Sequence, residues 1–486
     1  MSTISRVLRN VAIVSGGQAV TWCATIAFVL VQARFLGPAR FGELSLALSY
    51  AAFFAIVVDF GVATHLTRRV AQGESDERTA VWSALAVRTS LWILATPTAW
   101  LLTLALGYGA ELQATILILI DSLLFVGVTG ALAAYYQGHE RFLLPTIANV
   151  LQRVAAAVVG IVVVAAGFGI LTVAAVYAFS AALGCVLLIA GLRGSGVLAP
   201  RFDAGATLAL FRSVVPIGLY WVIGTFYFNV DMALVERLTP RDSLGHYAAA
   251  YRLFNALTIV PAIVCGTVLF PLYSRLSTVS LEALRPAVEK TISYLAVAGI
   301  LVTVLGVTLA SPIIAVLYPM PAYGPAASAL RLLAPGLLFL YLNSVLASVL
   351  FATHRERRLL AIAVMAAVLN TGANLIAIPV FGQEAAAAIT SATELFLLVC
   401  LFVAVPRGLL RAASAGVALR ASVAGGVAAL AMLPVAEAPV IVSGLVGCVA
   451  FACACFLFGV FPVDDVRALR ALVRGRVDAL GLVRAG

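Results

Sequence analysis

The sequence predicts an all-α integral membrane protein with about fourteen transmembrane helices. Hydrophobic residues make up 63% of the 486 residues, charged residues only 11%, and the mean hydropathy is +1.09. A soluble domain carries about a quarter charged residues. Apolar runs of roughly 20 residues, the length that crosses about 30 Å of hydrocarbon, recur along the chain. Because these runs are continuously apolar and do not alternate, they predict helices and not barrel strands.

Charged residues and Gly/Pro breaks separate the apolar runs and set the expected helix limits. The first run is longer than the core of a signal peptide and lacks a small-residue cleavage site, so it is expected to be retained. The predicted helices lie near residues 11–33, 42–64, 80–106, 112–136, 143–166, 170–192, 210–236, 245–270, 290–310, 328–352, 358–380, 384–405, 417–434 and 440–460.

The basic residues predict which loops face the cytoplasm. Assigning the loops alternately to two sides places 23 of the 31 Lys and Arg residues together, with Arg34, Arg40, Arg237 and Arg241 on the other side. Cytoplasmic loops carry the excess of positive charge, so both termini are predicted to be cytoplasmic. The net charge of +10 follows from this topology, because the basic residues do not form the basic aromatic surface of a nucleic-acid-binding protein.

Two pairs of segments suggest an internal duplication. Residues 36–47 resemble 238–249 with one insertion, and 137–141 weakly resemble 353–357. Six helices separate the copies, which predicts two parallel six-helix lobes; unrelated helical hairpins are the alternative. The expected parts are an N-lobe of helices 1–6 at 1–192, a cytoplasmic linker at 193–207, a C-lobe of helices 7–12 at 208–405, two extra C-terminal helices at 406–460, and a cytoplasmic amphipathic tail at 461–486.

Short motifs follow one another in a characteristic order over about residues 5–406. They are Arg-Phe-Leu-Gly-Pro at 34–38 with Phe-Gly at 41–42, Asp-Phe-Gly at 59–61, Tyr-Gln-Gly at 136–138, Gly-His-Tyr at 245–247 with Ala-Tyr-Arg at 250–252, Phe-Pro at 270–271, and the segment 374–379. Together they resemble the Wzx-type polysaccharide flippases of the multidrug/oligosaccharidyl-lipid/polysaccharide (MOP) superfamily.

This resemblance implies a transporter of the bacterial plasma membrane. It would flip undecaprenyl-pyrophosphate-linked oligosaccharide from the inner to the outer leaflet for polysaccharide biosynthesis, by alternating access. The implied partners are that lipid-linked glycan, membrane lipids, a proton or cation, and other polysaccharide assembly proteins, with no cofactor, metal or nucleic acid. The alternatives are a MurJ-like lipid II flippase, a cation-coupled exporter of small molecules and, in a different class, a membrane glycan polymerase or ligase.

The residues offer no motif for catalysis. A Gly-Lys-Ser/Thr phosphate loop, His/Cys metal spacing and a nucleophile motif are all missing from the sequence. Membrane glycan polymerases usually need a sizeable outer loop with catalytic Arg, His or Glu, and the longest predicted outer loop, 311–327, has no charged residue. The sequence therefore predicts a protein that is not an enzyme.

Charged residues within apolar runs are the candidates for substrate binding, because a charge in hydrocarbon is costly unless it faces water or a partner. A pyrophosphate headgroup carries two or more negative charges and suits the planar donor fork of Arg. The candidates are Arg88, Arg153 and Arg252. The alternative is that three interhelical ion pairs only hold helices together, namely Asp59–Arg88, Asp121–Arg153 and Asp231–Arg252.

Buried carboxyl groups are the candidates for ion coupling, because they can carry a proton or cation as a partner moves. These are Asp121, Asp231 and Glu394. Glu394 stands out because no basic residue lies at its depth on the predicted helices 10 to 12. The alternative is a carboxyl group that bonds a neighbouring helix and never titrates.

Overall fold

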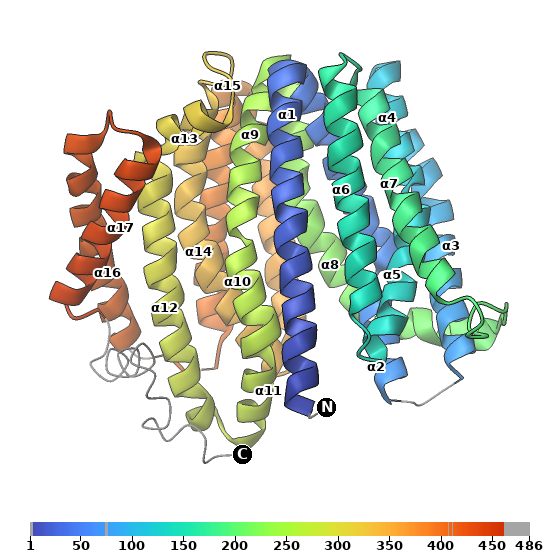
Figure 1. The fold of residues 1–486 in the computed structure, drawn as a ribbon. Coiled ribbons are helices and arrows are strands. Elements are labelled where there is room, and N and C mark those ends of the chain that lie inside the picture. The colour runs from blue at the N-terminus through green and yellow to red at the C-terminus, as the bar shows by residue number, and fades with distance from the viewer. Residues whose placement is uncertain (1–2, 73–75, 407, 411, 461–486) are drawn as a thin grey trace. The chain divides into compact units, whose positions relative to one another are not determined.

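The computed structural model describes residues 3–72, 76–406, 408–410 and 412–460, and within these residues the chain is all-helical (Figure 1). The first half contains α1 (Thr3–Asp59), α2 (Val62–Gln72), α3 (Glu77–Ala105), α4 (Ala110–Asp121), α5 (Leu123–Gly138), α6 (Leu143–Ala165), α7 (Ile170–Gly191) and α8 (Ala204–Leu238). The second half contains α9 (Arg241–Leu257), α10 (Ile259–Ile263), a π-helix (Val264–Leu269), α11 (Phe270–Val279), α12 (Leu281–Thr308), α13 (Ala310–Leu317), α14 (Ala326–Ala352), α15 (Glu356–Ala404), α16 (Ala412–Met432), a 3₁₀-helix (Leu433–Val435) and α17 (Val440–Leu457). The predicted tail at 461–486 lies outside the described residues.

Eleven helical segments of the described chain are long and apolar enough to cross a membrane. Two of them, Ile13–Gln72 with 60 residues and Glu356–Ala404 with 49, are each more than twice the length that one crossing needs. Each bends at a glycine with positive φ, Gly37 (φ 72°) in the first and Gly382 (φ 62°) in the second, a conformation that other residues rarely adopt. Each segment therefore divides into two spans, and the prediction of a polytopic all-α membrane protein is confirmed.

The eighth predicted helix, 245–270, is the least regular span. It corresponds to α9, α10, the π-helix and the start of α11, with a turn at Thr258 before α10 and the π-helix directly after it. Pro261 lies within α10 and Pro271 follows the π-helix. Proline removes a backbone donor and disturbs the preceding turn, which accounts for an interrupted helix in this part of the sequence.

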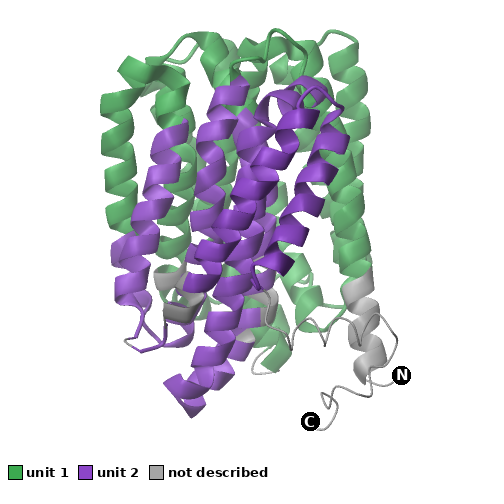
Figure 2. Cartoon of the chain, turned by 90° about the vertical axis from the view of Figure 1, so that its left-hand side faces the viewer, with its two compact units in different colours: residues 1–249, 317–325, 363–386 green, residues 250–316, 326–362, 387–486 purple. Residues whose placement is uncertain are grey.

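The chain forms two compact units (Figure 2). Unit 1 comprises residues 1–249, 317–325 and 363–386. One core of this unit joins α2, α3, α5 and α7 to Leu210 and Val214 of α8. The linker between α7 and α8 belongs to this packing, because the Trp82 indole donates to the Val197 carbonyl oxygen (3.1 Å) and Arg201 pairs with Asp76. These contacts explain why α8 falls in the same compact unit as the first seven helices; the predicted division into six-helix lobes stays a prediction.

Unit 2 comprises residues 250–316, 326–362 and 387–486, of which the last described residue is 460. Its core joins α12 to the two last helices, α16 and α17, through small and medium side chains such as Ala424, Ala428 and Ala454. Small residues let helix backbones approach closely, which is how helices associate where lipid tails are as apolar as the helices themselves. The two extra C-terminal helices of the prediction are thus packed on α12 within the unit.

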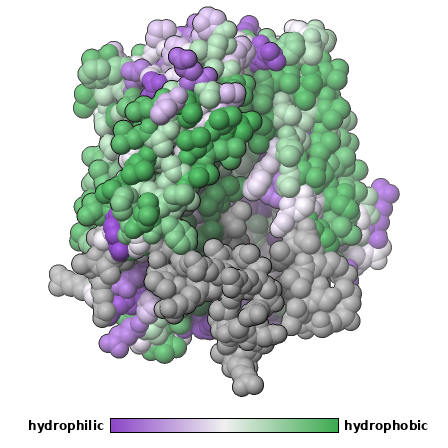
Figure 3. Space-filling view, turned by 60° about the vertical axis from the view of Figure 1, so that its left-hand side comes forward, coloured by the Kyte–Doolittle hydropathy of each residue, from purple (hydrophilic) through white to green (hydrophobic). Residues whose placement is uncertain are grey.

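The outer surface of the helices is apolar, as a membrane requires. In the view of Figure 3, hydrophobic side chains cover most of the helix flanks, and hydrophilic side chains gather at the helix ends at the top. Exposed fractions reach 77% at Val403 and 83% at Leu457. Such exposure would be a liability in water, but it is the expected state of side chains that face acyl chains.

The two copies of the predicted repeat motif contact each other inside unit 1. Aligning residues 36–47 with 238–249 matches Gly42 of α1 to Gly245 of α9. A Cβ atom added to Gly42 would lie 2.7 Å from the Gly245 nitrogen, and one added to Gly245 would overlap the backbone of Pro38. The two backbones are therefore in direct contact.

Aromatic side chains surround this contact. The loop at 317–325 places Tyr318 and Tyr323 edge-on to Phe41, with ring centroids 6.2 and 6.0 Å away. The Tyr323 hydroxyl donates to the Ala33 carbonyl oxygen (3.1 Å), and a ring nitrogen of His246 lies 2.8 Å from the Ala322 carbonyl oxygen. The loop thereby packs the part of α1 around the bend at Gly37 against α9.

We expect Gly245→Ala to destabilise the protein. The new methyl group would overlap the Pro38 backbone, which cannot move aside as a flexible side chain would, and overpacking of this kind costs about 1–3 kcal/mol. The measurement is the thermal unfolding midpoint of the purified protein in detergent. The matched control is Gly224→Ala in α8, where nothing lies within 4 Å of the added atom. Equal midpoints for wild type and Gly245→Ala would contradict the close contact.

Candidate functional site

A buried ion pair joins α1 to α3 in unit 1. Arg88, only 4% exposed, pairs with Asp59 and donates Nη1 to the Gly127 carbonyl oxygen at 2.6 Å. Gly130 makes room for this arrangement, because a Cβ atom there would collide with the guanidinium group. The Asp59–Arg88 pair, expected from the similar depth of the two residues, is confirmed. Removing Asp59 would leave the buried charge of Arg88 uncompensated.

Asp59 is the more accessible member of this pair. Its side chain is 37% exposed and lines a cavity of about 140 Å³ together with Val126 and Gly130. Arg88 uses its donors on Asp59 and Gly127, so its fork is already engaged by protein atoms. The structure therefore gives Arg88 the role of holding Asp59 and the α5 backbone, and presents the carboxylate to the cavity.

Arg153 on α6 is placed differently. Its side chain is exposed and makes no hydrogen bond or ion pair with residues in the described part of the chain. It precedes Ala156, Ala157 and Gly160, three of the five buried positions of this helix, by three, four and seven residues, so it shares their face. Val162, 64% exposed, is nine residues away and thus on the opposite side at about 100° per residue. Arg153 therefore faces away from the exposed apolar stripe and is still open.

The expected pair between Asp121 and Arg153 is not formed, and that interpretation is wrong. Asp121 ends α4, is exposed, and accepts a hydrogen bond from the Thr96 hydroxyl of α3 at 3.3 Å. The helix α4 packs against α1, α3 and α7. Depth along two helices made the pair plausible, but the carboxyl group points from the end of α4 toward α3 and not toward α6.

Asp231 on α8 is buried, with 2% of its surface exposed. It accepts hydrogen bonds from the hydroxyl of the fully buried Tyr247 of α9 and from the Met232 backbone N–H at 2.9 Å. Arg252, five residues after Tyr247 on α9, is half-buried. The sequence analysis did not predict the contact of Asp231 with Tyr247. The signal in the sequence is the tyrosine of the Gly-His-Tyr motif at 245–247.

Glu394 on α15 is also buried, at 2% exposure, and contacts α14. The Asn343 side-chain amide donates to the Glu394 carboxylate Oε2 at 2.8 Å and to the Glu394 carbonyl oxygen at 2.9 Å. Sequence reasoning missed Asn343, whose signal is an amide in the middle of an otherwise apolar run. The Asn343 amide therefore orients the Glu394 carboxyl group and joins α14 to α15.

The chain matches a protein family over more than half of its length. Residues 7–277 match the family described as "Polysaccharide biosynthesis protein", and residues 216–376 match the family described as "MatE". A curated relative, the "Succinoglycan biosynthesis transport protein ExoT" of Rhizobium meliloti (strain 1021), is 26% identical over 256 residues. That match covers 51% of this chain and 50% of the relative, so the chain spans about half the length of this relative.

Solved structures share the fold. The "Lipid II flippase MurJ, inward closed conformation" is similar with a TM-score of 0.76 and 14% identity, covering 91% of this chain and 98% of the other. An inward-facing multidrug resistance transporter of the MATE family and MOP superfamily is similar with a TM-score of 0.64 and 14% identity, covering 79% and 93%. At these identities the likeness concerns the fold alone.

The family match, the shared fold and the eleven membrane-crossing segments agree with one another. The chain belongs to the polysaccharide biosynthesis protein family and is a multi-pass membrane protein with the fold of the MurJ and MATE structures.

Proposed function

We propose that this protein is a transporter that flips undecaprenyl-pyrophosphate-linked oligosaccharide from the inner to the outer leaflet of the bacterial plasma membrane, by alternating access. The observation that carries the proposal is Arg153, an open guanidinium group on the packed face of a membrane-crossing helix. A cation in that position needs water or an anion beside it. In a family of polysaccharide biosynthesis proteins, the pyrophosphate of a lipid-linked glycan is the anion that fits.

In this proposal the polar residues have different roles. Arg153 binds the headgroup by its planar fork, while Arg88, whose fork is engaged, positions Asp59 at the edge of the small cavity. Arg252 stays a second candidate for the headgroup. Glu394, Asp231 and Asp121 stay the candidates for carrying a proton or cation, with the first two buried and hydrogen-bonded and the third exposed.

Lipid II is the alternative cargo, favoured by the structural likeness to a lipid II flippase. Both cargoes carry a pyrophosphate between an isoprenoid and a sugar, so the same cation would serve either. Complementation distinguishes them. A strain lacking its polysaccharide flippase should recover polysaccharide export on expression of this chain, whereas a strain depleted of its lipid II flippase should not recover growth. The reverse pattern would assign lipid II as cargo.

We expect Arg153→Ala to reduce flipping by roughly tenfold or more, because hydrogen bonds to charged groups contribute about 1.5–3 kcal/mol. Arg153→Lys should recover only part of the rate, since an ammonium group lacks the planar fork. The rate is measured in proteoliposomes as the appearance of glycan in the outer leaflet. The matched control is Arg193→Ala, an exposed arginine in the linker between α7 and α8. Equal transport by wild type and Arg153→Ala would remove Arg153 from the headgroup site.

Glu394→Gln should preserve substrate binding and abolish the response of transport to an imposed pH gradient. The Gln carbonyl oxygen can still accept from the Asn343 amide, so the contact between α14 and α15 survives while the titrating group is lost. Glu384→Gln, an exposed carboxyl on the same helix, is the control. If Glu394→Gln keeps the wild-type response, another group or the membrane potential drives transport.

The proposal places both termini in the cytoplasm and the bend of α1 at Gly37 outside. In a cysteine-free background, a cysteine replacing the exposed Asp242 should react with a membrane-impermeant thiol reagent in intact cells. A cysteine replacing the exposed Arg193 should react only after the membrane is permeabilised. Protection of position 242 together with labelling of position 193 would reverse the orientation.

A further inference from the structure

Unit 1 contains a pocket of about 520 Å³ beside the bend of α1 at Gly37 and Pro38. Its volume falls within the range of small-molecule sites, roughly 300–1,000 Å³. None of the residues proposed above for the headgroup or for ion coupling lines it. Both copies of the repeat motif contribute to its wall, which includes Arg40, Glu43, Tyr108, Glu111, Glu236, Arg237 and Arg241.

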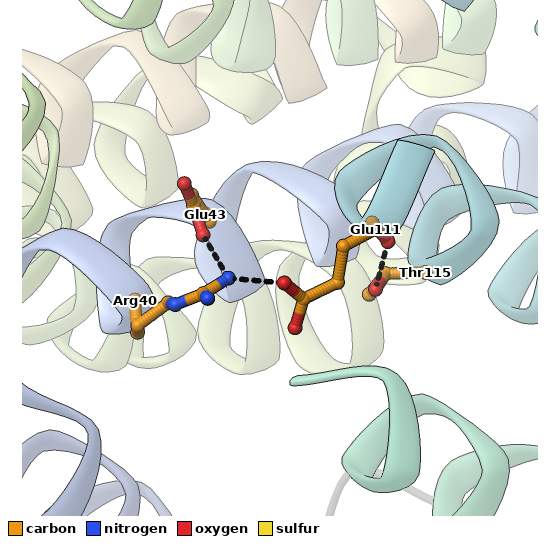
Figure 4. Close-up of polar contacts among 4 residues, drawn as sticks. All are labelled: Arg40, Glu43, Glu111 and Thr115. Carbon is orange, nitrogen blue, oxygen red and sulfur yellow. Dashed lines mark hydrogen bonds and ion pairs between the residues drawn. The ribbon is translucent and has the colours of Figure 1, made fainter. Parts of the chain in front are cut away.

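One side of the pocket is a fixed ion-pair network (Figure 4). The Arg40 guanidinium lies 3.1 Å from the Glu43 carboxylate, one turn later on α1, and 2.6 Å from the Glu111 carboxylate at the start of α4. The Thr115 hydroxyl donates to the Glu111 carbonyl oxygen at 2.7 Å. Arg40 is therefore neutralised by two carboxylates and is not available to an incoming anion.

Tyr108 forms a second part of the pocket wall. It lies in the turn between α3 and α4, its hydroxyl is 3.1 Å from the Tyr50 hydroxyl, and the two rings meet edge to face. Burial, together with Tyr50 and Glu236, raises the pKa of Tyr108, so this hydroxyl stays protonated. The Tyr108 hydroxyl also interacts with the Glu236 carboxyl group as a hydrogen-bond donor. Tyr108 therefore holds Glu236 of α8 at the turn between α3 and α4.

Two cations of the pocket are not engaged. Arg237 and Arg241 are exposed, and neither makes a hydrogen bond or ion pair with any described residue. Both line the same pocket as Glu43 and Glu111. The available chemistry is therefore two guanidinium forks, which suit a carboxylate, and the carboxylate oxygens of Glu43 and Glu111, which suit hydroxyl groups.

Gly107 and Gly109 leave part of the wall as bare backbone. A Cβ atom added to either would meet nothing within 4 Å. Gly107 has a φ of +68°, which restricts it to glycine, but Gly109 is in an extended conformation that any residue adopts. Gly109 therefore offers a position where a larger side chain would fill the pocket without changing its charges.

We propose that this pocket binds an acidic saccharide, a pyranose that carries a carboxylate beside its hydroxyl groups. The proposal rests on the proposed function, since the predicted topology places the pocket at the outer surface, where a flipped glycan emerges. A neutral sugar would bring no anion to pair with the exposed guanidinium groups of Arg237 and Arg241. A pyrophosphate would bring several negative charges next to Glu43, Glu111 and Glu236, where like charges repel.

The test is equilibrium binding to the purified full chain in lipid nanodiscs, followed by calorimetry. The probes are the disaccharide of glucuronic acid and glucose, its neutral analogue cellobiose, and inorganic pyrophosphate. We expect the acidic disaccharide to bind at least about tenfold more tightly than cellobiose, because charge-assisted hydrogen bonds are roughly twice as strong as neutral ones. Pyrophosphate should bind this site more weakly than the acidic disaccharide.

Two variants locate the site. The double variant Arg237→Gln with Arg241→Gln should lose the preference for the acidic disaccharide, and Gly109→Leu should abolish binding of both sugars while every charge is kept. Arg34→Gln, an exposed arginine outside the pocket, should bind as the wild type does. Equal binding of the acidic and neutral sugars, tighter binding of pyrophosphate, or no binding of any saccharide would each overturn the proposal. Because binding is measured without transport, a failed flipping assay would count against the proposed function alone.

Discussion

The hydrocarbon interior of a membrane offers no hydrogen-bond partner, and this constraint determines most of the structure. Backbone groups must bond within their own segment, so the apolar runs form helices. Charged side chains must find an opposite charge, a polar group or water. Two contacts meet this requirement in different ways. Arg88 forms an ion pair with Asp59, and Glu394 accepts a hydrogen bond from the neutral amide of Asn343.

Glycines allow the helices to bend, to approach each other closely and to make room for a buried side chain. Gly37 and Gly382 turn two long helical segments, and Gly42 with Gly245 brings the backbones of α1 and α9 into direct contact. Gly130 does something different, since it leaves the volume that the Arg88 guanidinium fills beside α5. Without that volume the arginine could not reach both Asp59 and the Gly127 carbonyl oxygen, and one of these two contacts would be lost.

The sequence predicts those features that depend on position along the chain, and fails on those that depend on direction around a helix. Spans follow from apolar runs, and the Asp59–Arg88 pair follows from depth. Depth alone also suggested the pair of Asp121 with Arg153, which is wrong because the two side chains leave their helices in different directions. Asn343 was missed for the same reason, since its relation to Glu394 depends on how α14 and α15 are rotated.

The pocket beside Arg40 was beyond sequence reasoning because its wall combines segments from residue 39 to residue 244. Its charges nevertheless follow a rule that also holds within the membrane. Arg40 and Arg88 are each held by carboxylates, whereas Arg153, Arg237 and Arg241 have no such partner among the described residues. A held arginine shapes its surroundings, and an open one is available to a ligand.

The three open arginines to which the proposals give a role fall in two places along the helices. Arg153 lies within the membrane-crossing part of α6, and Arg237 and Arg241 lie at the junction of α8 and α9. A lipid-linked glycan likewise has two kinds of polar group, a pyrophosphate next to the lipid and sugars that extend away from it. On the proposed function, one polar position would meet the phosphate and the other the sugars. The two groups of arginines would then follow each other in the same order as the pyrophosphate and the sugars of the cargo. A carrier of one small cation would not require two such groups.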